Sequence, residues 1–463
     1  LGNTQNLNLN SQLNLQVSGN ISPDVALLLS ANDQQIPFQP SGTTAQIQDF
    51  DQIFAQLKHK HAQLRLGDIQ LQSDNSSQFL KYFKKAQGLA LELQNTDSAQ
   101  KKHVQLNSKA AFTISKGKFS RFSFMATEQV QGPYRLLGAN QEVFITVLSG
   151  TERIYMDGKL LQRGQDLDYT IDYNAAEIYF TARQPITKDK RIVTEFQYTD
   201  RQFSRSLWML QETIKTANQA FGLQFYREQD NTRNPLQAYS PQMRDALQWA
   251  GDSAQYAALT AVTASDDRSQ PLYVKHDTLI DNRLYNPVYT RSDDTTRMRY
   301  TIAFAYVGPN KGNYQIASGS QNGRFMQWVQ PVNNIPQGAY DTVLAITAPQ
   351  RQDLLSVTYA FTPDSTTQLF AEAVYSKRDV NMFSTRDKGN DEGYAFLMSA
   401  KTPLLKSIPL HGESRIEFNN AQFQGIERFR SVEFDRDWNR SGVIWHNAVL
   451  LYKQALHLQF KNP

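Results

Sequence analysis

Hydrophobic and polar side chains alternate with a period of two along several long segments of the chain. The first is 7–17, where leucine and valine alternate with asparagine and glutamine. This alternation predicts a β-strand with one apolar and one polar face, and its length of about ten residues suits a strand that crosses a membrane. A half-exposed strand of a soluble β-sandwich would show the same pattern, so this segment alone leaves both alternatives open.

More strands of this kind are expected in the first quarter of the chain. We predict a break at 18–20, a second strand over 25–31, and an antiparallel pair formed by 47–57 and 62–71. The apolar positions of 47–57 also fit a helical period, and the adjacent strand-like segment decides in favour of a strand.

The segment 62–71 changes its apolar parity in the middle. Leu64 and Leu66 share one parity while Ile69 and Leu71 share the other, and the change at Gly67 predicts a β-bulge. Beyond it we expect one helical turn within 75–85 and then further up-and-down strands. These strands contain Leu89, Leu91, Leu93, Ala110, Phe112, Ile114, Phe122 and Phe124.

From residue 132 to 200 the predicted strands are short and closely spaced. Asp157-Gly158 indicates a two-residue hairpin, because both turn positions of that hairpin favour a positive φ. The strands are too short for a membrane wall, which needs about 9–11 residues per strand. We therefore predict a compact β-sandwich-like module inserted between longer strands.

Longer strands return over 201–239, and one helix is then expected. Ser240 is a favourable N-cap, Pro241 suits the first helical position, and Gly251 can end the helix in the left-handed conformation. Met243 and Leu247 lie on one face of this helix, which we expect to pack on a neighbouring module.

These segments predict five regions. Residues 1–131 hold a first group of barrel strands, 132–200 the inserted module, 201–239 more barrel strands, 240–352 the helix and a second irregular β insertion, and 353–463 the last barrel strands. The predicted fold class is all-β: an antiparallel transmembrane β-barrel, not necessarily complete in this chain, with inserted small β-sandwich-like modules.

The composition excludes several classes of protein. The 463 residues are 40% hydrophobic and 20% charged with a mean hydropathy of −0.54, and no run approaches the ~18 apolar residues of a spanning helix. This criterion does not detect barrel strands, because apolar lipid-facing and polar lumen-facing residues alternate and cancel in the mean hydropathy. A net charge of +4 gives no case for a nucleic-acid partner. The absence of cysteine excludes thiol catalysis, Cys-ligated metals and disulfides.

No pattern for catalysis or cofactor binding is present, so we expect no enzyme, cofactor or metal. His59 and His61 share one face if they lie on a strand and could then bind a metal, but a turn between two strands explains them better. Three acidic groups could suggest calcium but lack the spacing of a calcium loop. They are Asp266-Asp267, Asp281 with Asp293-Asp294, and 387–392.

A dense cluster of charged residues near the C-terminus is the one candidate site. Its members are Glu427, Arg428, Arg430, Glu433, Asp435, Arg436 and Asp437. Basic residues facing lipid near the midplane would cost ~2–4 kcal/mol each, so the cluster must face the barrel lumen or lie outside the membrane. We favour a mutually paired, solvated face, and the alternative is a charged lumen or docking patch that handles a passing chain or solute.

Several phrases resemble large, poorly characterised outer-membrane barrel proteins of the Bacteroidota. They include PFQPSGTTAQIQDFDQIF (37–54), GPYRLLGANQEVFITVL (132–148) and YMDGKLLQRGQDLDYTIDY (155–173). The opening is also similar to the giant translocon barrel of the type IX secretion system. The resemblance implies a barrel with periplasmic or surface β-modules and no catalytic residues. At 174–176, where the family pattern has glycine, this chain has Asn-Ala-Ala, so we expect a looser hairpin.

The chain ends add one expectation. The sequence does not begin with the basic start and apolar run of a signal peptide, and its last residues 460–463 lack the terminal aromatic typical of outer-membrane barrels. The proteins that the chain resembles are also longer. We therefore expect a trimmed or partial chain.

The resulting hypothesis is a non-enzymatic protein of the bacterial outer membrane, in contact with outer-membrane lipid and with other envelope proteins. Its role would be transport, protein secretion or outer-membrane protein assembly, and any small-molecule ligand is unknown. The alternative is a soluble multi-domain β-sandwich surface protein, such as an adhesin or a glycan-binding protein.

Overall fold

The computed structural model of the chain describes residues 12–34, 52–74, 76–95, 104–115, 117–139, 145–199, 204–232, 239–252, 258–260, 262–265, 272–280, 283–292, 294, 296–302, 304–317, 325–333, 335–345, 347–404, 410–440 and 448–458. Residues 7–11 of the first predicted strand and most of the phrase 37–54 lie outside them. The same holds for Asp266, Asp267, Asp281 and Asp293.

The chain forms two compact units, which are described separately. The first contains Leu1–Ala238, Gln350–Asp379 and Lys388–Pro463. The second contains Tyr239–Pro349 and Val380–Asp387.

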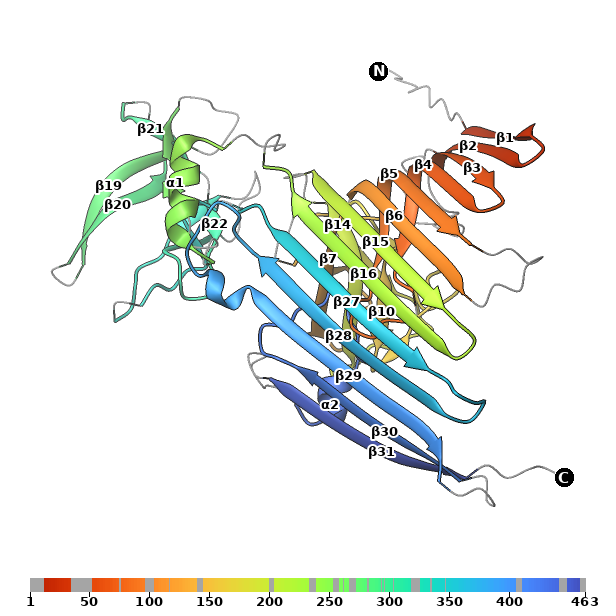
Figure 1. The fold of residues 1–463 in the computed structure, drawn as a ribbon. Coiled ribbons are helices and arrows are strands. Elements are labelled where there is room, and N and C mark those ends of the chain that lie inside the picture. The colour runs from red at the N-terminus through yellow and green to blue at the C-terminus, as the bar shows by residue number, and fades with distance from the viewer. Residues whose placement is uncertain are drawn as a thin grey trace. The chain divides into compact units, whose positions relative to one another are not determined.

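The first unit is built on one sheet of 13 strands, which Figure 1 shows with β1 and β31 at its two edges. In sheet order its strands are β1 (Gln12–Ser22), β2 (Val25–Gln34), β3 (Gln52–His59), β4 (Ala62–Gln72), β5 (Phe83–Gln94), β6 (Gln105–Ser115), β15 (Arg205–Lys215), β16 (Gln219–Asp230), β27 (Arg351–Phe361), β28 (Gln368–Asp379), β29 (Glu392–Pro403), β30 (Leu410–Asn419) and β31 (Val449–Leu458). All neighbours are antiparallel. Among the described residues no pairing joins β1 to β31, so the sheet is open.

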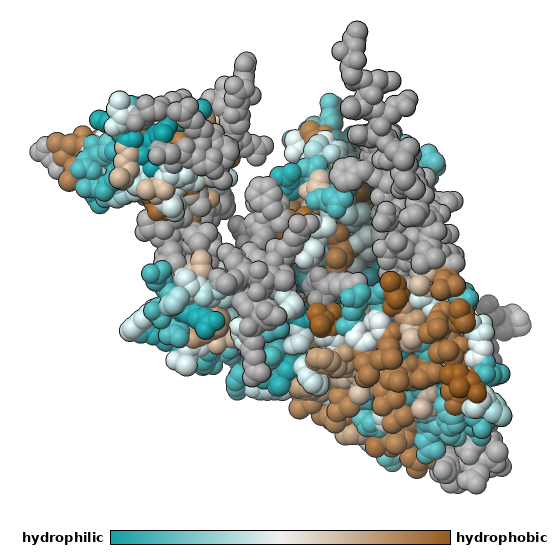
Figure 2. All heavy atoms as spheres, turned by 90° about the horizontal axis from the view of Figure 1, so that it is seen from above, coloured by the Kyte–Doolittle hydropathy of each residue, from teal (hydrophilic) through white to brown (hydrophobic). Residues whose placement is uncertain are grey.

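The predicted alternation gives this sheet two different faces. On the outer face, large apolar side chains remain between 36% and 66% exposed, and Figure 2 shows such residues gathered in one patch. They are Leu15, Val17, Leu29, Ile53, Leu66, Leu89, Leu93, Leu106, Phe112, Ile114, Trp208, Leu210, Ile214, Phe221, Leu355, Val357, Tyr359, Leu369, Tyr375, Tyr394, Phe396, Met398, Ile416, Leu450, Tyr452 and Leu456. The inner face carries mostly polar residues, among them Gln56, Arg65, Lys84, Glu92, Lys109, Gln211, Gln224, Glu228, Ser356, Glu372, Lys401, Arg415, Glu417 and Lys453.

Two local predictions near the N-terminus were wrong. Strand β1 continues through 18–20 and turns at 23–24 instead. Strand β4 pairs with β5 without a register shift, so there is no bulge: Leu64 and Leu66 face outward, whereas Ile69 and Leu71 face inward and are buried. Gly67 is required for another reason, because a Cβ there would lie 2.2 Å from the Ile53 carbonyl oxygen.

The predicted module is a separate small fold with its own core. One of its sheets contains β7 (Lys118–Met125), β9 (Thr146–Val147), β10 (Arg153–Met156), β11 (Lys159–Leu160) and β14 (Arg191–Thr199), and the other contains β8 (Tyr134–Arg135), β12 (Tyr169–Asp172) and β13 (Glu177–Phe180). Fully buried residues including Ile154, Ile178 and Phe196 fill the space between them. Strand β7 pairs with β14, so the module begins near Lys118, and Phe122 and Phe124 do not belong to the long strands.

The predicted two-residue hairpin of the module is confirmed. Asp157 and Gly158 form its turn with φ angles of 49° and 84°. The hairpin at 173–176 has a four-residue loop, with Asp172 paired to Glu177. Ala176 takes a φ of 54° there, a left-handed conformation that glycine adopts more easily.

The second unit contains the predicted helix, α1 (Pro241–Ala250), and several small sheets. The Ser240 side chain accepts a hydrogen bond from the backbone N–H of Met243 at 3.2 Å, which confirms the N-cap. At the other end Asn381 donates to the carbonyl oxygens of Leu247 and Gly251, both at 2.8 Å. The strands are β17 (Ala258–Thr260), β18 (Val262–Ala264), β19 (Tyr273–Ile280), β20 (Arg283–Arg291), β21 (Arg299–Ile302), β22 (Ala305–Tyr306), β23 (Tyr314–Ile316), β24 (Met326–Trp328), β25 (Tyr340–Asp341) and β26 (Val343–Ala345).

The fold class is therefore all-β, with a large antiparallel sheet and small inserted β-modules, as predicted. In the described part of the chain only short helical segments interrupt it: α1, the 3₁₀ turn η2 (Lys388–Asn390) and α2 (Phe434–Asp437). Among the described residues, no helix is both long enough and apolar enough to cross a membrane.

Candidate functional site

Two connections between long strands lie against the inner face of the large sheet. We call 73–82, which joins β4 to β5, and 420–440, which follows β30, the inner segments. The predicted helical turn near the first of them is wrong, because 73–82 is irregular throughout its described residues. Several of its backbone N–H groups donate to side chains and not along a helical repeat. Those of Gln78 and Phe79 donate to Glu372 of the sheet, and those of residues 76, 80 and 82 donate to side chains of the segment itself.

Glu372 of β28 holds the first inner segment on the sheet. Its side chain is 3% exposed and accepts hydrogen bonds from the backbone N–H groups of Gln78 at 2.7 Å and Phe79 at 3.4 Å. The hydroxyls of Ser77 and Ser356 donate to the same carboxylate, the second at 3.1 Å. A buried carboxylate with this many donors is well satisfied, and it fixes the conformation of the segment.

The two inner segments also pack against each other. The Phe79 ring, which is fully buried, lies edge-on to Phe423 and Phe429, with centroids 5.5 and 5.2 Å away. The Gln78 side chain donates to the Phe429 carbonyl at 2.7 Å, and the backbone N–H of Glu427 donates to the Lys81 carbonyl at 3.1 Å. The segments thus form one apolar cluster with the inward residues of the sheet.

A buried network of charges continues along the inner face. Lys84, 1% exposed, lies 3.2 Å from the Glu228 carboxylate, which also accepts a hydrogen bond from the Tyr226 hydroxyl at 2.7 Å. Arg205 contacts Glu228 at 3.6 Å and Asp230 at 2.7 Å. Each carboxylate in this network faces at least one cation, which is the condition for burying such groups at tolerable cost.

The predicted charge cluster lies on the second inner segment, and most of its members bind elsewhere in the unit. Arg428 forms an ion pair with Glu195 of β14, with Nη2 and Oε2 3.3 Å apart, and its Nη2 lies 3.1 Å from the Tyr155 hydroxyl. Glu427 accepts a hydrogen bond from the backbone N–H of Phe83 at 2.9 Å. These contacts join the second inner segment to the module and to the start of β5.

Arg430 and Glu433 make the same kind of link. Arg430 lies 2.8 Å from the Glu417 carboxylate of β30 and donates to Asn419 at 2.7 Å. Glu433 lies 3.0 Å from Arg191 of the module. Thus the cluster connects the sheet, the second inner segment and the module.

Arg436 and Asp437 are the exposed members of the cluster, with side chains 56% and 55% exposed and 3.8 Å apart. Arg436 also lies 3.4 Å from Glu433. Only this end matches the mutually paired, solvated face that we favoured. Of the other five members, Glu427, Arg428, Arg430 and Glu433 are paired with other elements, and Asp435 is half-buried beside them in the same segment.

Burial shifts the pKa of several groups here. It raises the pKa of the Glu427 carboxyl, although the Phe83 N–H and Lys84 favour the charged form. Burial alone would lower the pKa of Arg428, but the hydrogen bonds and charge of Glu195 and the nearby Tyr155 raise it above its ordinary value. Arg428 is therefore a permanent cation next to a buried carboxylate.

Two further hydrogen bonds join the module to β5. The Gln197 side chain of β14 donates to the Phe83 carbonyl oxygen. Lys85 donates to the Ser149 carbonyl oxygen at 3.4 Å. Both involve the start of β5, where the sequence predicted a helical turn within 75–85 and not a strand.

The other candidates from the sequence form no site where the structure describes them, and Asp266, Asp267, Asp281 and Asp293 lie outside the described residues. His59 ends β3 and His61 precedes β4, so they lie in a turn, as favoured, with ring centroids 6.1 Å apart. Lys388, which follows Asp387, pairs with Asp379 at 2.6 Å. The described residues contain no group of three or more His, Cys, Asp or Glu side chains that could hold a metal ion.

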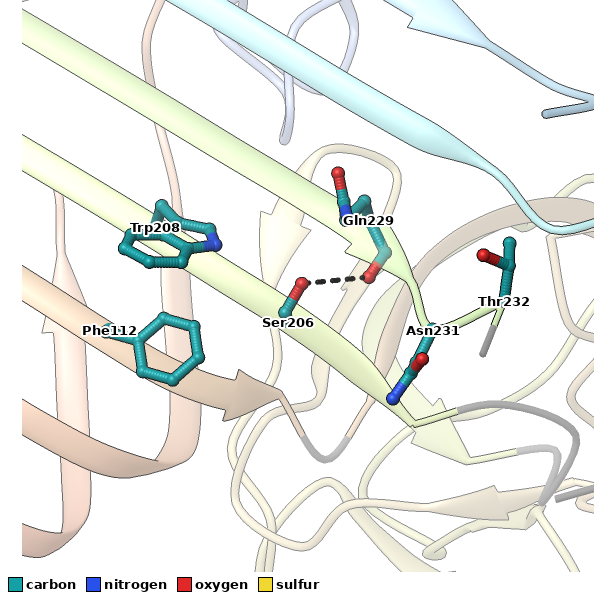
Figure 3. Close-up of a pocket in the computed structure, with 6 residues that line it drawn as sticks. All are labelled: Phe112, Ser206, Trp208, Gln229, Asn231 and Thr232. Atoms are coloured by element: carbon teal, nitrogen blue, oxygen red, sulfur yellow. Dashed lines mark hydrogen bonds between the residues drawn. The ribbon is translucent and has the colours of Figure 1, made fainter. Parts of the chain in front are cut away.

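A shallow pocket of about 420 Å³ lies on the outer face. Phe112 of β6 and Trp208 of β15 face each other there with centroids 4.3 Å apart (Figure 3). Ser206 donates to the Gln229 carbonyl at 3.5 Å, and Asn231 and Thr232 complete the lining. None of the described residues that line the pocket is titratable, and together they offer an amphipathic surface.

Sequence reasoning missed Glu372, Lys84, Glu228 and Glu195. Each is a charged residue at an inward position of a long strand or in the module, and parity alone could have marked the first three as inner-face residues. Their partners could not be found this way, because Ser77 is 295 residues from Glu372.

A family model described as a domain of unknown function (DUF8818) matches residues 119–200, which coincide with the module. No curated protein sequence matches the chain. The resemblance to Bacteroidota barrels and to the type IX translocon therefore stays a prediction.

Solved structures that overlap with the chain are outer-membrane proteins. The trimer form of in-vitro folded OmpT from Vibrio cholerae is 7% identical, with 88% of this chain and 80% of that chain covered and a TM-score of 0.23. OccAB4 of Acinetobacter baumannii is 10% identical, with 88% and 83% covered and a TM-score of 0.18. These scores are too low to establish a shared fold, and the architecture described above stands on its strand pairing.

Proposed function

We propose that the chain is a non-enzymatic β-barrel protein of the bacterial outer membrane. The observation that carries the proposal is the contrast between the faces of the large sheet: apolar and uncovered outside, polar and partly filled inside. A soluble protein rarely leaves so large an apolar patch uncovered, whereas a barrel wall in lipid requires one.

The size of the apolar region supports this assignment. Outward residues are apolar from Leu355 to Phe361 on β27, and on β6 they extend from Leu106 to Ile114 with Ser108 as the one polar position. These stretches measure about 20 to 27 Å along the strand, similar to the ~25 Å apolar band of outer-membrane barrels. The strands of 8 to 12 residues are also longer than the ~5–6 residues usual in soluble sheets.

The filled inner face bears on the kind of role. The inner segments and the module occupy part of the surface that would line a channel, and Glu372, Arg428 and Arg430 fix them there. We propose that the protein acts in transport, protein secretion or outer-membrane protein assembly, together with other envelope proteins, and that it does not act as an open diffusion pore. Membership of the Bacteroidota barrels that its phrases resemble is part of this proposal.

Fractionation of expressing cells tests the assignment. The protein should sediment with outer membranes, resist extraction by salt or alkali, and become monodisperse only in detergent. A protein that is monodisperse in buffer without detergent would contradict the proposal and would favour the alternative, a soluble β-sandwich surface protein. The compact sandwich-like module is the one feature that favours this alternative.

A further inference from the structure

We infer that the strand ends that carry the module and the second unit point to the cell exterior, and that the tight turns point to the periplasm. This inference rests on the proposed outer-membrane location. It assigns a side to every connection of the large sheet.

The connections of the sheet differ strongly between its two ends. Because all strands are antiparallel and joined in chain order, alternate connections lie at the same end. At one end they are 23–24, 60–61, 95–104, 216–218, 362–367 and 404–409. At the other end they are 35–51, 73–82, 116–204, 231–350, 380–391 and 420–448.

The second set holds both inner segments, the module and most of the second unit, while each connection of the first set is between two and ten residues long. Outer-membrane barrels have short periplasmic turns and longer extracellular loops. The asymmetry of this sheet therefore identifies the two sides.

The outward apolar residues of the sheet, which we call the apolar belt, also lie closer to one end of the strands than to the other. At the tight-turn end it reaches the strand termini, as Phe361 at the end of β27 and Leu369 near the start of β28 show. At the other end the outer face becomes charged before the strands end: Arg227 pairs with Asp353 at 2.9 Å, and Lys377 pairs with Glu392 at 2.8 Å. On β16, β27, β28 and β29 the outer face is thus charged beyond the apolar belt at the end where the large insertions begin.

This placement means that the module, and the charge cluster that binds it, meet the external medium. A partner or cargo that acts on the module would approach from outside the cell. The tight turns leave little structure for a periplasmic partner to bind among the described residues of that end.

The absence of cysteine makes a direct test available, since a single introduced thiol is the only one in the protein. Ala182→Cys in the module and Ala217→Cys in the 216–218 turn form a matched pair, because both replace an exposed alanine in a turn. Ser365→Cys in 362–367 provides a second, conservative position at the tight-turn end. The probe is a membrane-impermeant maleimide applied to intact cells and to cells with a permeabilised outer membrane. A periplasmic cysteine protein serves as leakage control.

The inference predicts that Ala182→Cys is labelled equally in both preparations. Labelling of Ala217→Cys and Ser365→Cys should be lost in intact cells and appear after permeabilisation. The reverse pattern, equal labelling at both ends, or labelling at neither end in intact cells would overturn the orientation. Recovery of the protein outside the membrane fraction would instead refute the proposed function, so the two failures are distinguishable.

Discussion

Replacing Glu372 by alanine should release the first inner segment from the sheet. The change leaves four donors without their acceptor: the hydroxyls of Ser77 and Ser356 and the backbone N–H groups of Gln78 and Phe79. The hydroxyls can rotate toward other acceptors, whereas the two N–H groups cannot turn without moving the segment. Each buried donor left unpaired costs about 1–3 kcal/mol, so the two N–H groups together should reduce the stability of the docked segment by about 2–6 kcal/mol.

Hydrogen exchange measured by mass spectrometry on the detergent-solubilised protein checks this prediction. Peptides that cover 73–82 should lose protection in the Glu372→Ala variant, while peptides of distant β31 keep theirs. Ser356→Ala is the matched control, because it removes one hydroxyl from the same carboxylate and costs only about 0.5–1.5 kcal/mol. Unchanged protection of 73–82 in Glu372→Ala would refute the view that this carboxylate holds the segment.

Three further predictions concern the module and the turns. Arg428→Ala leaves the buried Glu195 carboxylate with a weaker partner and should lower the stability of the module by about 3–5 kcal/mol. Hydrogen exchange over 145–199 should then be faster. Gly158→Ala places a side chain at a φ of 84° and should lower the unfolding temperature of the module, whereas a replacement at an extended position should not. Hydrogen bonds from Thr366 and the backbone lower the pKa of Asp364 to about 2. The stabilisation of the turn by the Asp364 carboxylate is therefore fully present above pH 3.8 and is lost as the pH falls through about 2. An NMR titration of this carboxyl would detect the shift.

The period-two alternation was sufficient to predict most of the large sheet, because burial of one face depends only on parity. It failed for Phe122 and Phe124, since parity shows which side chains share a face and not which strand is the neighbour. It also led to a false bulge at Gly67. There, apolar residues occupy both faces in turn, first toward the outside and then toward the inner segments.

The helix α1 was predicted correctly because its signals are local. Ser240, Pro241 and Gly251 act within a few residues of the helix ends. The candidate site was predicted only in part, since the cluster at 427–437 is dense enough to be noticed in one segment. Its partners Glu195, Arg191 and Glu417 lie far away in the chain, and only the fold brings them together.

The central claim, that the outer face of the sheet meets lipid, is tested most directly by a charge placed on that face. Val357 lies in the middle of β27 and is 36% exposed. In lipid, Val357→Arg should cost ~2–4 kcal/mol near the midplane, whereas an exposed substitution in water stays within about ±0.5 kcal/mol. Ala217→Arg in a tight turn is the control and should be neutral in both cases. Urea unfolding in lipid vesicles should show a clear loss for Val357→Arg alone, and equal stability of the two variants would contradict the account.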